Sequence, residues 1–443
     1  MKRKFSIGLI LSICFIILII IGGMYVHGQG DDVKFEEITY LGDISACNGV
    51  SIDITSKDQY FKNEIRISFN EGLNYQAKYE SLFHEVDVSN PFDFFRLNFS
   101  LYRIQEEHSR FENKEGTFHY LVSDYYDYLP ISFELWNSEH YITTESEINK
   151  LLQVSVPEDA EVVYENDKNT SSTNNKNIPS ISNDLPKVKI GDYYYFTIPN
   201  LELTDTKYRG ISGILVFDVK QDSLYDNKID KTIKVLYPIE ISSDKKVQVL
   251  NIAKVTNANY IALAVLEDNN LYLYLYDLEK QELITKKKVG ETPENATIKS
   301  FEFIEQGDIL LANYLYNMNR SKEESTLFGV VAVYEFTKEN EIKVHMESEY
   351  LRKLPKELKD RFIYYNNEFF YHENKVFLLS RNYDYEINNG FKLIAFNDKE
   401  ILYAGMINGS MNEEYTIGQQ NTKNQHVLTD YSNRTITRIG FVK

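Results

Sequence analysis

The chain has 443 residues, with 66 acidic against 48 basic side chains, and a net charge of −18 at neutral pH. A nucleic-acid partner needs a basic face that releases its counterions, so this charge excludes DNA and RNA as expected ligands. The two cysteines, Cys14 and Cys47, provide no disulfide framework. A chain of this length can instead bury a large hydrophobic core, and we expect Cys47 to lie in it as a small apolar residue.

The first four residues, MKRK, are basic, and residues 5–26 then contain no charged side chain. A membrane-spanning helix needs about 20 apolar residues, whereas the apolar part of a cleavable signal has about 7–15. The pattern predicts a transmembrane anchor at residues 5–26, with residues 1–4 cytoplasmic because basic flanks stay on that side. Residues 31–443 would then lie outside the cytoplasm in a single-pass protein of the cell membrane. The alternative is a secreted protein, cleaved near Gly28.

Residues 271–283, LYLYLYDLEKQEL, alternate Leu and Tyr. Successive side chains of a strand point to opposite faces, so one face carries leucines and the other tyrosines. An antiparallel strand with one wet face alternates apolar and polar residues instead. This segment therefore predicts a strand that is covered on both faces.

Related hairpins recur along the chain. The segments LVFDV, LYDL, VYEF and AFND each place an aromatic or apolar residue before a polar one, and their polar residues, Asp218, Asp277, Glu335 and Asn397, follow one another at intervals of about 60 residues. Two weaker matches lie upstream, at Asn70 and Glu134. The longer gap between Glu134 and Asp218 contains residues 165–186, which have almost no apolar side chain and are predicted to be a disordered polar insertion or linker.

Stacked repeats of small antiparallel sheets cover their inner strands on both faces and leave only short edges. The sequence therefore predicts an all-β fold, a β-propeller of six or seven irregular blades behind the N-terminal transmembrane helix. The hairpin LYLYDLEKQEL resembles the outer strands of bacterial propellers with loose repeats, although WD40, kelch and Asp-box motifs are absent. The alternative is a separate β domain at residues 31–164, followed by a smaller propeller at residues 187–443.

Catalytic motifs are missing from the sequence. It contains no HExxH, G-x-S-x-G, P-loop or dinucleotide-binding pattern, and no histidine pair at the spacing of adjacent metal ligands. We expect no cofactor and no metal, and an enzyme is less expected than a binding protein.

The most suggestive polar stretch is SDYYDYLP at residues 123–130, and NYDYEINNG at residues 382–390 resembles it. Tyrosines can stack on a sugar while carboxylates bond its hydroxyls, and loops on a rigid scaffold commonly carry recognition residues. DYYYF, at residues 192–196, is a similar but more apolar cluster. The candidate binding residues are Asp124, Tyr125, Tyr126, Asp127, Tyr128, Tyr383, Asp384 and Tyr385.

These features predict a membrane-anchored extracytoplasmic β-propeller that acts as a binding, accessory or sensory module. Its expected partners are the membrane, through residues 5–26, and a protein, peptide or glycan ligand. The alternative function is a secreted or tethered polysaccharide hydrolase or lyase that uses two carboxylates. A third possibility is a structural partner of another membrane protein.

Overall fold

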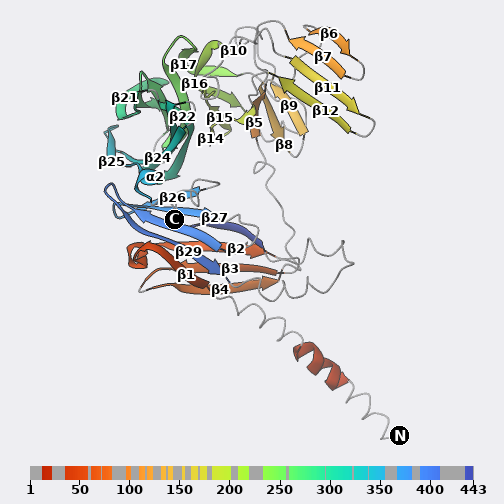
Figure 1. The fold of residues 1–443 in the computed structure, drawn as a ribbon. Coiled ribbons are helices and arrows are strands. Elements are labelled where there is room, and N and C mark those ends of the chain that lie inside the picture. The colour runs from red at the N-terminus through yellow and green to blue at the C-terminus, as the bar shows by residue number, and fades with distance from the viewer. Residues whose placement is uncertain are drawn as a thin grey trace. The chain divides into compact units, whose positions relative to one another are not determined.

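The computed structural model describes most strands of the chain and the turns between many of them. The described residues are 12–21, 35–57, 61–70, 72–81, 96–100, 109–114, 117–122, 131–135, 138–142, 152–154, 161–167, 170–176, 182–200, 208–218, 233–255, 259–294, 296–321, 324–337, 339–354, 367–381, 390–409 and 435–442. Within them the strands form seven antiparallel sheets of four or five strands each (Figure 1). The expected all-β fold class is confirmed.

The chain divides into two compact units. The first unit joins Met1–Asp87 to Ser348–Lys443, and the second is Val88–Glu347. The division therefore falls near residues 87 and 348 rather than at residue 164, where the alternative two-domain interpretation placed it.

Three sheets of the second unit follow one another along the chain, and in each the strands pair in sequence order. Their strands are β14 (Lys187–Ile190), β15 (Tyr193–Phe196), β16 (Tyr208–Asp218) and β17 (Lys234–Ser242); β18 (Val247–Val255), β19 (Tyr260–Glu267), β20 (Asn270–Asp277) and β21 (Glu282–Glu291); and β22 (Ala296–Gln306), β23 (Ile309–Ser321), β24 (Glu324–Phe336) and β25 (Ile342–Ser348). A short strand, β10 (Leu152–Val154), also pairs with β16.

The same unit contains two sheets with less regular connections, in the orders β12-β11-β7-β6 and β13-β5-β8-β9. Their strands are β5 (Arg96–Ser100), β6 (Ser109–Lys114), β7 (Thr117–Val122), β8 (Ile131–Leu135), β9 (Ser138–Ile142), β11 (Glu161–Asp167), β12 (Thr170–Lys176) and β13 (Ser182–Asp184). Residues 165–186, expected to be a disordered insertion or linker, thus contain the end of β11 and all of β12 and β13. The domain role of this range stays a prediction.

The first unit consists of two sheets that each combine strands from both ends of the chain. One sheet has the order β1-β29-β28-β27-β26 and the other the order β30-β2-β3-β4. The strands are β1 (Phe35–Gly42), β2 (Ser51–Lys57), β3 (Phe61–Ser68), β4 (Asn74–Ser81), β26 (Asn367–His372), β27 (Lys375–Arg381), β28 (Gly390–Phe396), β29 (Ile401–Gly409) and β30 (Thr435–Phe441), with short helices η1 (Ile44–Cys47) and α2 (Tyr350–Lys353). Pairing of β1 with β29 and of β30 with β2 joins the two ends of the chain.

The Leu/Tyr segment is covered on both faces, as its alternation predicts. Leu271 and Leu273 of β20 belong to an apolar cluster that they share with β22, β23 and β24. Tyr274 and Tyr276 belong to a second cluster, shared with the sheet of β14–β17. All four side chains are at most 4% exposed. The sheet of β18–β21 is therefore the middle layer of a stack of three.

The 60-residue interval corresponds to one four-stranded sheet. Asp218 and Asp277 are the last residues of β16 and β20, Glu335 is next to last in β24, and Asn397 directly follows β28. Each of these strands is the third of its sheet. Asp277 Oδ1 accepts the backbone N–H groups two and three residues on, at 2.9 and 3.0 Å, and Asn397 Oδ1 does the same at 2.8 Å in each case. At these two positions the repeated polar residue stabilises the turn into the fourth strand.

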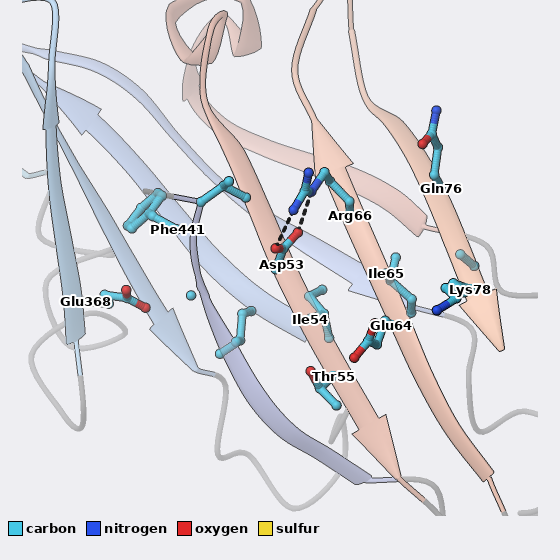
Figure 2. Close-up of a pocket in the computed structure, with 14 residues that line it drawn as sticks. Asp53, Ile54, Thr55, Glu64, Ile65, Arg66, Gln76, Lys78, Glu368 and Phe441 are labelled. Atoms are coloured by element: carbon cyan, nitrogen blue, oxygen red, sulfur yellow. Dashed lines mark hydrogen bonds and ion pairs between the residues drawn. The ribbon is translucent and has the colours of Figure 1, made fainter. Parts of the chain in front are cut away.

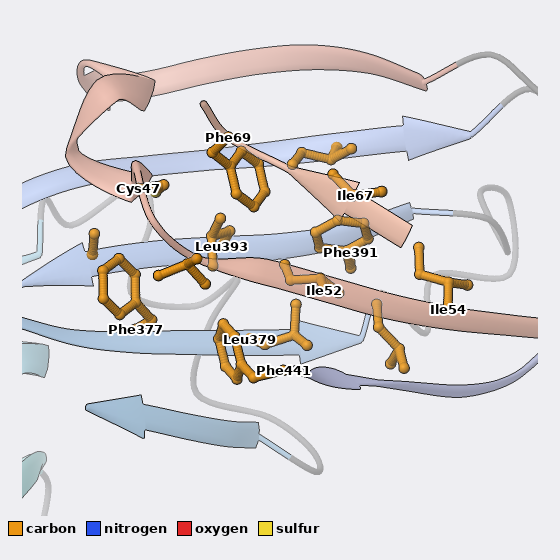
Figure 3. Packing of buried hydrophobic residues seen from close by; sticks show 14 of the residues in the cluster. Cys47, Ile52, Ile54, Ile67, Phe69, Phe377, Leu379, Phe391, Leu393 and Phe441 are labelled. Atoms are coloured by element: carbon orange, nitrogen blue, oxygen red, sulfur yellow. The ribbon is translucent and has the colours of Figure 1, made fainter. Parts of the chain in front are cut away.

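The two sheets of the first unit pack face to face through one apolar core (Figure 3). Ile52 and Ile67 of one sheet meet Phe377 and Phe391 of the other, and all four are fully buried. Cys47 is also fully buried at the end of this core, as expected for a small apolar residue.

The prediction of a single-pass membrane protein is wrong. Within the described part of the chain, no helix is long and apolar enough to cross a bilayer. The described helical residues near the N-terminus are 12–21.

We predict that Leu273→Ala destabilises the protein by about 2–5 kcal/mol, because it leaves a cavity between two stacked sheets. Val344→Ala is the matched control: Val344 is 42% exposed, so its truncation is expected to cost less than about 0.5 kcal/mol. Urea unfolding, monitored by far-ultraviolet circular dichroism, measures the free energy of unfolding of both variants. Equal losses for the two variants would show that β20 is not covered on both faces.

A second prediction concerns the C-terminal strand. Removal of residues 435–443 leaves β2 without its partner β30 and removes Ile439 and Phe441 from the core of the first unit. Loss of a buried aromatic side chain alone costs about 3–5 kcal/mol, a large part of a typical stability of about 5–15 kcal/mol. We expect limited proteolysis to degrade the first unit of the truncated chain, whereas deletion of Lys443 alone leaves the digestion pattern unchanged. Identical digestion of both chains would contradict the pairing of β30 with β2.

Candidate functional site

The tyrosine-rich segments singled out in the sequence lie outside the described residues, and their binding role stays a prediction. This holds for Asp124, Tyr125, Tyr126, Asp127 and Tyr128 in residues 123–130, and for Tyr383, Asp384 and Tyr385 in residues 382–389. The strands on either side of residues 123–130 are present as expected, but β7 and β8 belong to different sheets. Residues 382–389 join β27 to β28 within one sheet.

The third aromatic cluster, residues 192–196, is described and is mainly structural. Tyr194 and Phe196 are 5% and 0% exposed and belong to an apolar core cluster. Tyr193 is 45% exposed. Most of this cluster therefore packs the interior and is not available to a ligand.

One sheet of the first unit has a polar, accessible face. In β2 and β3, Ile52, Ile54, Ile65 and Ile67 alternate with polar residues and are at most 1% exposed. Because successive side chains point to opposite faces, the intervening polar residues lie on the face away from the core. The buried isoleucines fix these strands, so the polar side chains stand on a rigid sheet.

The strand register arranges these polar residues in two cross-strand rows (Figure 2). One row contains Asp53, Arg66 and Gln76, and the next contains Thr55, Glu64 and Lys78. Opposite charges thus face each other on neighbouring strands, which is a favourable arrangement for cross-strand pairs.

Asp53 and Arg66 form a two-pronged ion pair. Arg66 Nε donates to Asp53 Oδ1 at 2.7 Å, and Nη2 donates to Oδ2 at 2.8 Å. The hydrogen bonds and the negative charge of Asp53 raise the pKa of Arg66. Both side chains are at least half exposed, so the pair contributes little to stability.

Gly440 of β30 and Glu368 of β26 form one side of this surface (Figure 2). Gly440 is the register partner of Asp53. A Cβ atom at position 440 would lie 2.8 Å from Glu368 Oε2, so the absence of a side chain leaves room for the Glu368 carboxylate. A glycine within a strand commonly marks a place where another group approaches the backbone closely.

Together these residues line a groove of about 730 Å³. We call it the polar groove, and define it by Asp53, Thr55, Glu64, Arg66, Gln76, Lys78, Glu368 and Gly440. Its size is typical of small-molecule sites, which occupy about 300–1,000 Å³, but most such sites are lined by apolar side chains. Hydrogen bonding, rather than burial of apolar surface, is therefore the interaction that this groove offers a ligand.

A second polar network, in the sheet of β18–β21, supports packing. Tyr274 donates a hydrogen bond to Glu267, and Lys286 Nζ donates to the other carboxylate oxygen of Glu267 at 2.6 Å. Lys286 also lies over the rings of Tyr272 and Tyr274. Burial, together with the bond to Glu267, raises the pKa of Tyr274 to about 12, so its hydroxyl stays protonated at neutral pH.

Nucleophile and metal chemistry find little support in the described residues. Burial raises the pKa of the Cys47 thiol to about 12, which leaves it protonated and unreactive. In the part of the chain that the structure describes, no group of three or more His, Cys, Asp or Glu side chains could hold a metal ion.

The residues of the polar groove were not selected from the sequence, although a signal was present. IDIT in β2 and EIRI in β3 alternate isoleucine with polar residues, the pattern of a sheet with one wet face. Glu368 and Gly440 had no sequence signal, because Gly440 joins this sheet through the pairing of β30 with β2, and Glu368 lies on β26 of the other sheet, which contacts β30.

No protein-family model and no curated protein matches this chain. Solved structures with some likeness include a protein from Lactobacillus plantarum, at 9% identity and a TM-score of 0.26 over 81% of this chain and 99% of that one. The periplasmic gluconolactonase of Pseudomonas aeruginosa has 9% identity and a TM-score of 0.25, over 89% and 99% of the two chains. A prolyl endopeptidase has 8% identity and a TM-score of 0.23, over 82% of this chain and 42% of that one. TM-scores of this size carry no argument about fold or activity.

Proposed function

We propose that the protein is a binding module on a β-propeller scaffold, and that the polar groove holds a peptide or glycan ligand by hydrogen bonds. The observation that carries this proposal is the Asp53–Arg66 pair in the groove, on strands β2 and β3, whose isoleucine side chains on the opposite face are buried. Polar groups that a rigid scaffold holds in place lose little entropy when they bind a ligand.

The contacts between sheets support the propeller scaffold. In the second unit, the first strands of successive sheets touch in order, since β14 contacts β18 and β18 contacts β22. In the first unit, β26 contacts β30, and both are first strands of their sheets. Adjacent first strands, stacked four-stranded sheets and a C-terminal strand that completes an N-terminal sheet are all expected of radial repetition.

A carboxylate-based hydrolase or lyase receives less support. Its general acid needs a carboxyl group whose pKa is raised, commonly by burial in an apolar pocket. Asp53 is instead half exposed and engaged by Arg66 through both oxygens. Asp53 is therefore better suited to hold a ligand than to protonate a leaving group.

We predict that Arg66→Ala weakens ligand binding about tenfold or more, because a hydrogen bond to a charged group contributes about 1.5–3 kcal/mol. The ligand is first found by screening the wild-type protein against immobilised oligosaccharides and peptides. The affinity of the best hit is then compared between wild type and variant by calorimetry. The thermal unfolding midpoint should change little, since the ion pair is exposed.

Lys245→Ala is the matched control, because Lys245 forms an exposed ion pair with Glu240 on β17, in the second unit, and does not line the groove. It removes one positive charge, as Arg66→Ala does, and should leave the affinity unchanged. Equal affinities of wild type and Arg66→Ala for the hit would place binding elsewhere. Absence of any hit with the wild-type protein would reject the binding role.

A further inference from the structure

The state of the charges in the polar groove restricts the ligand that it can hold. Arg66 and Asp53 already neutralise each other at 2.7 and 2.8 Å. An ionic group on a ligand must displace one member of this pair to form an ion pair with the other. A neutral ligand needs no such exchange.

Hydrogen-bonding capacity nevertheless remains in the pair. A guanidinium has five N–H donors, and Asp53 receives a bond from Nε and one from Nη2 only. Each carboxylate oxygen can accept more than one hydrogen bond. A hydroxyl group both donates and accepts, so one hydroxyl can bond the carboxylate while another accepts from the guanidinium.

The two polar rows repeat this combination of hydrogen-bond donors and acceptors across the sheet. Neighbouring strands lie about 4.8 Å apart, and successive side chains on one face lie about 6.6–6.8 Å apart along a strand. Asp53, Arg66 and Gln76 therefore present alternating acceptors and donors at steps comparable to the length of one sugar ring. The apolar side chains that line the groove are not available to a ligand, since Ile54, Ile439 and Phe441 are at most 8% exposed.

From these observations we infer that the ligand of the polar groove is a neutral oligosaccharide, and that Gly440 and Glu368 determine which sugar ring fits at its β30 side. This inference rests on the proposed binding function. Because Gly440 has no side chain, the Glu368 carboxylate lies close to the backbone of β30. A sugar ring at this side of the groove can place a hydroxyl against Glu368.

Gly440→Ala tests this inference by adding a methyl group without changing any charge. The backbone of Gly440 is not in the left-handed region, and the clashing atoms are the far end of a flexible glutamate, so we expect the variant to fold. The added Cβ forces Glu368 to move. Binding of a neutral oligosaccharide should weaken about tenfold, which corresponds to about 1.4 kcal/mol.

Gly290→Ala is the matched control, because Gly290 also lies in a strand, and its added Cβ would meet only ordinary contacts, the nearest at 3.6 Å. The affinity of Gly290→Ala for the neutral oligosaccharide should equal that of wild type. Gly440→Ala combined with Glu368→Ala removes the clash while keeping the methyl group. The thermal unfolding midpoint of Gly440→Ala, compared with that of the double variant, shows whether a weak-binding Gly440→Ala protein is merely unfolded.

The probes are arrays of neutral oligosaccharides, acidic oligosaccharides and mixed-charge peptides, read at about 0.05 M and about 0.5 M salt. Binding to a neutral oligosaccharide that changes little with salt supports the inference, since screening affects mainly interactions between charges. Selective binding of acidic sugars or peptides, lost at high salt and in Arg66→Ala, would overturn the inference and leave the binding function standing. Absence of binding to all three arrays would overturn both.

Discussion

The structure depends on apolar contact between small sheets that cannot be stable alone. A four-stranded sheet has two faces, and β20 shows how both are used: its leucines pack on one neighbouring sheet and its tyrosines on the other. Burial of an apolar side chain contributes about 1.5–3 kcal/mol, so each sheet is stabilised mainly by its neighbours. Turns such as those at Asp277 and Asn397 then need only direct the chain from one strand to the next.

Within the first unit, the sheet of β30, β2, β3 and β4 uses its two faces differently. Its isoleucine face packs on the sheet of β26–β29, while its other face carries cross-strand charge pairs. The same alternation that anchors the sheet therefore provides a fixed array of polar groups. Pairing of β30 with β2 adds Gly440 to that array, so the groove depends on the joining of the two ends of the chain.

Short-range patterns predicted the strands, the doubly covered Leu/Tyr segment and the interval of one sheet per 60 residues, because these follow from alternation and from Asx turns that act within a few residues. The prediction of a transmembrane anchor was wrong, since no helix within the described residues is long and apolar enough to cross a bilayer. Contacts between distant segments could not be predicted from these short-range patterns. Glu368 and Gly440 are 72 positions apart in the sequence, and only the contact between β26 and β30 places them together.

Native-state hydrogen exchange tests most directly whether stacking on both faces is the basis of the fold. If stacking on both faces is the basis of the fold, the backbone amides of β20, including those of Leu273 and Leu275, are among the slowest to exchange, with an opening free energy close to that of global unfolding. The edge strand β21, whose lysines are exposed, should exchange faster by local opening. If the amides of β20 exchange as fast as those of β21, stacking on both faces is not the basis of the fold, because this sheet then opens without disturbing its neighbours.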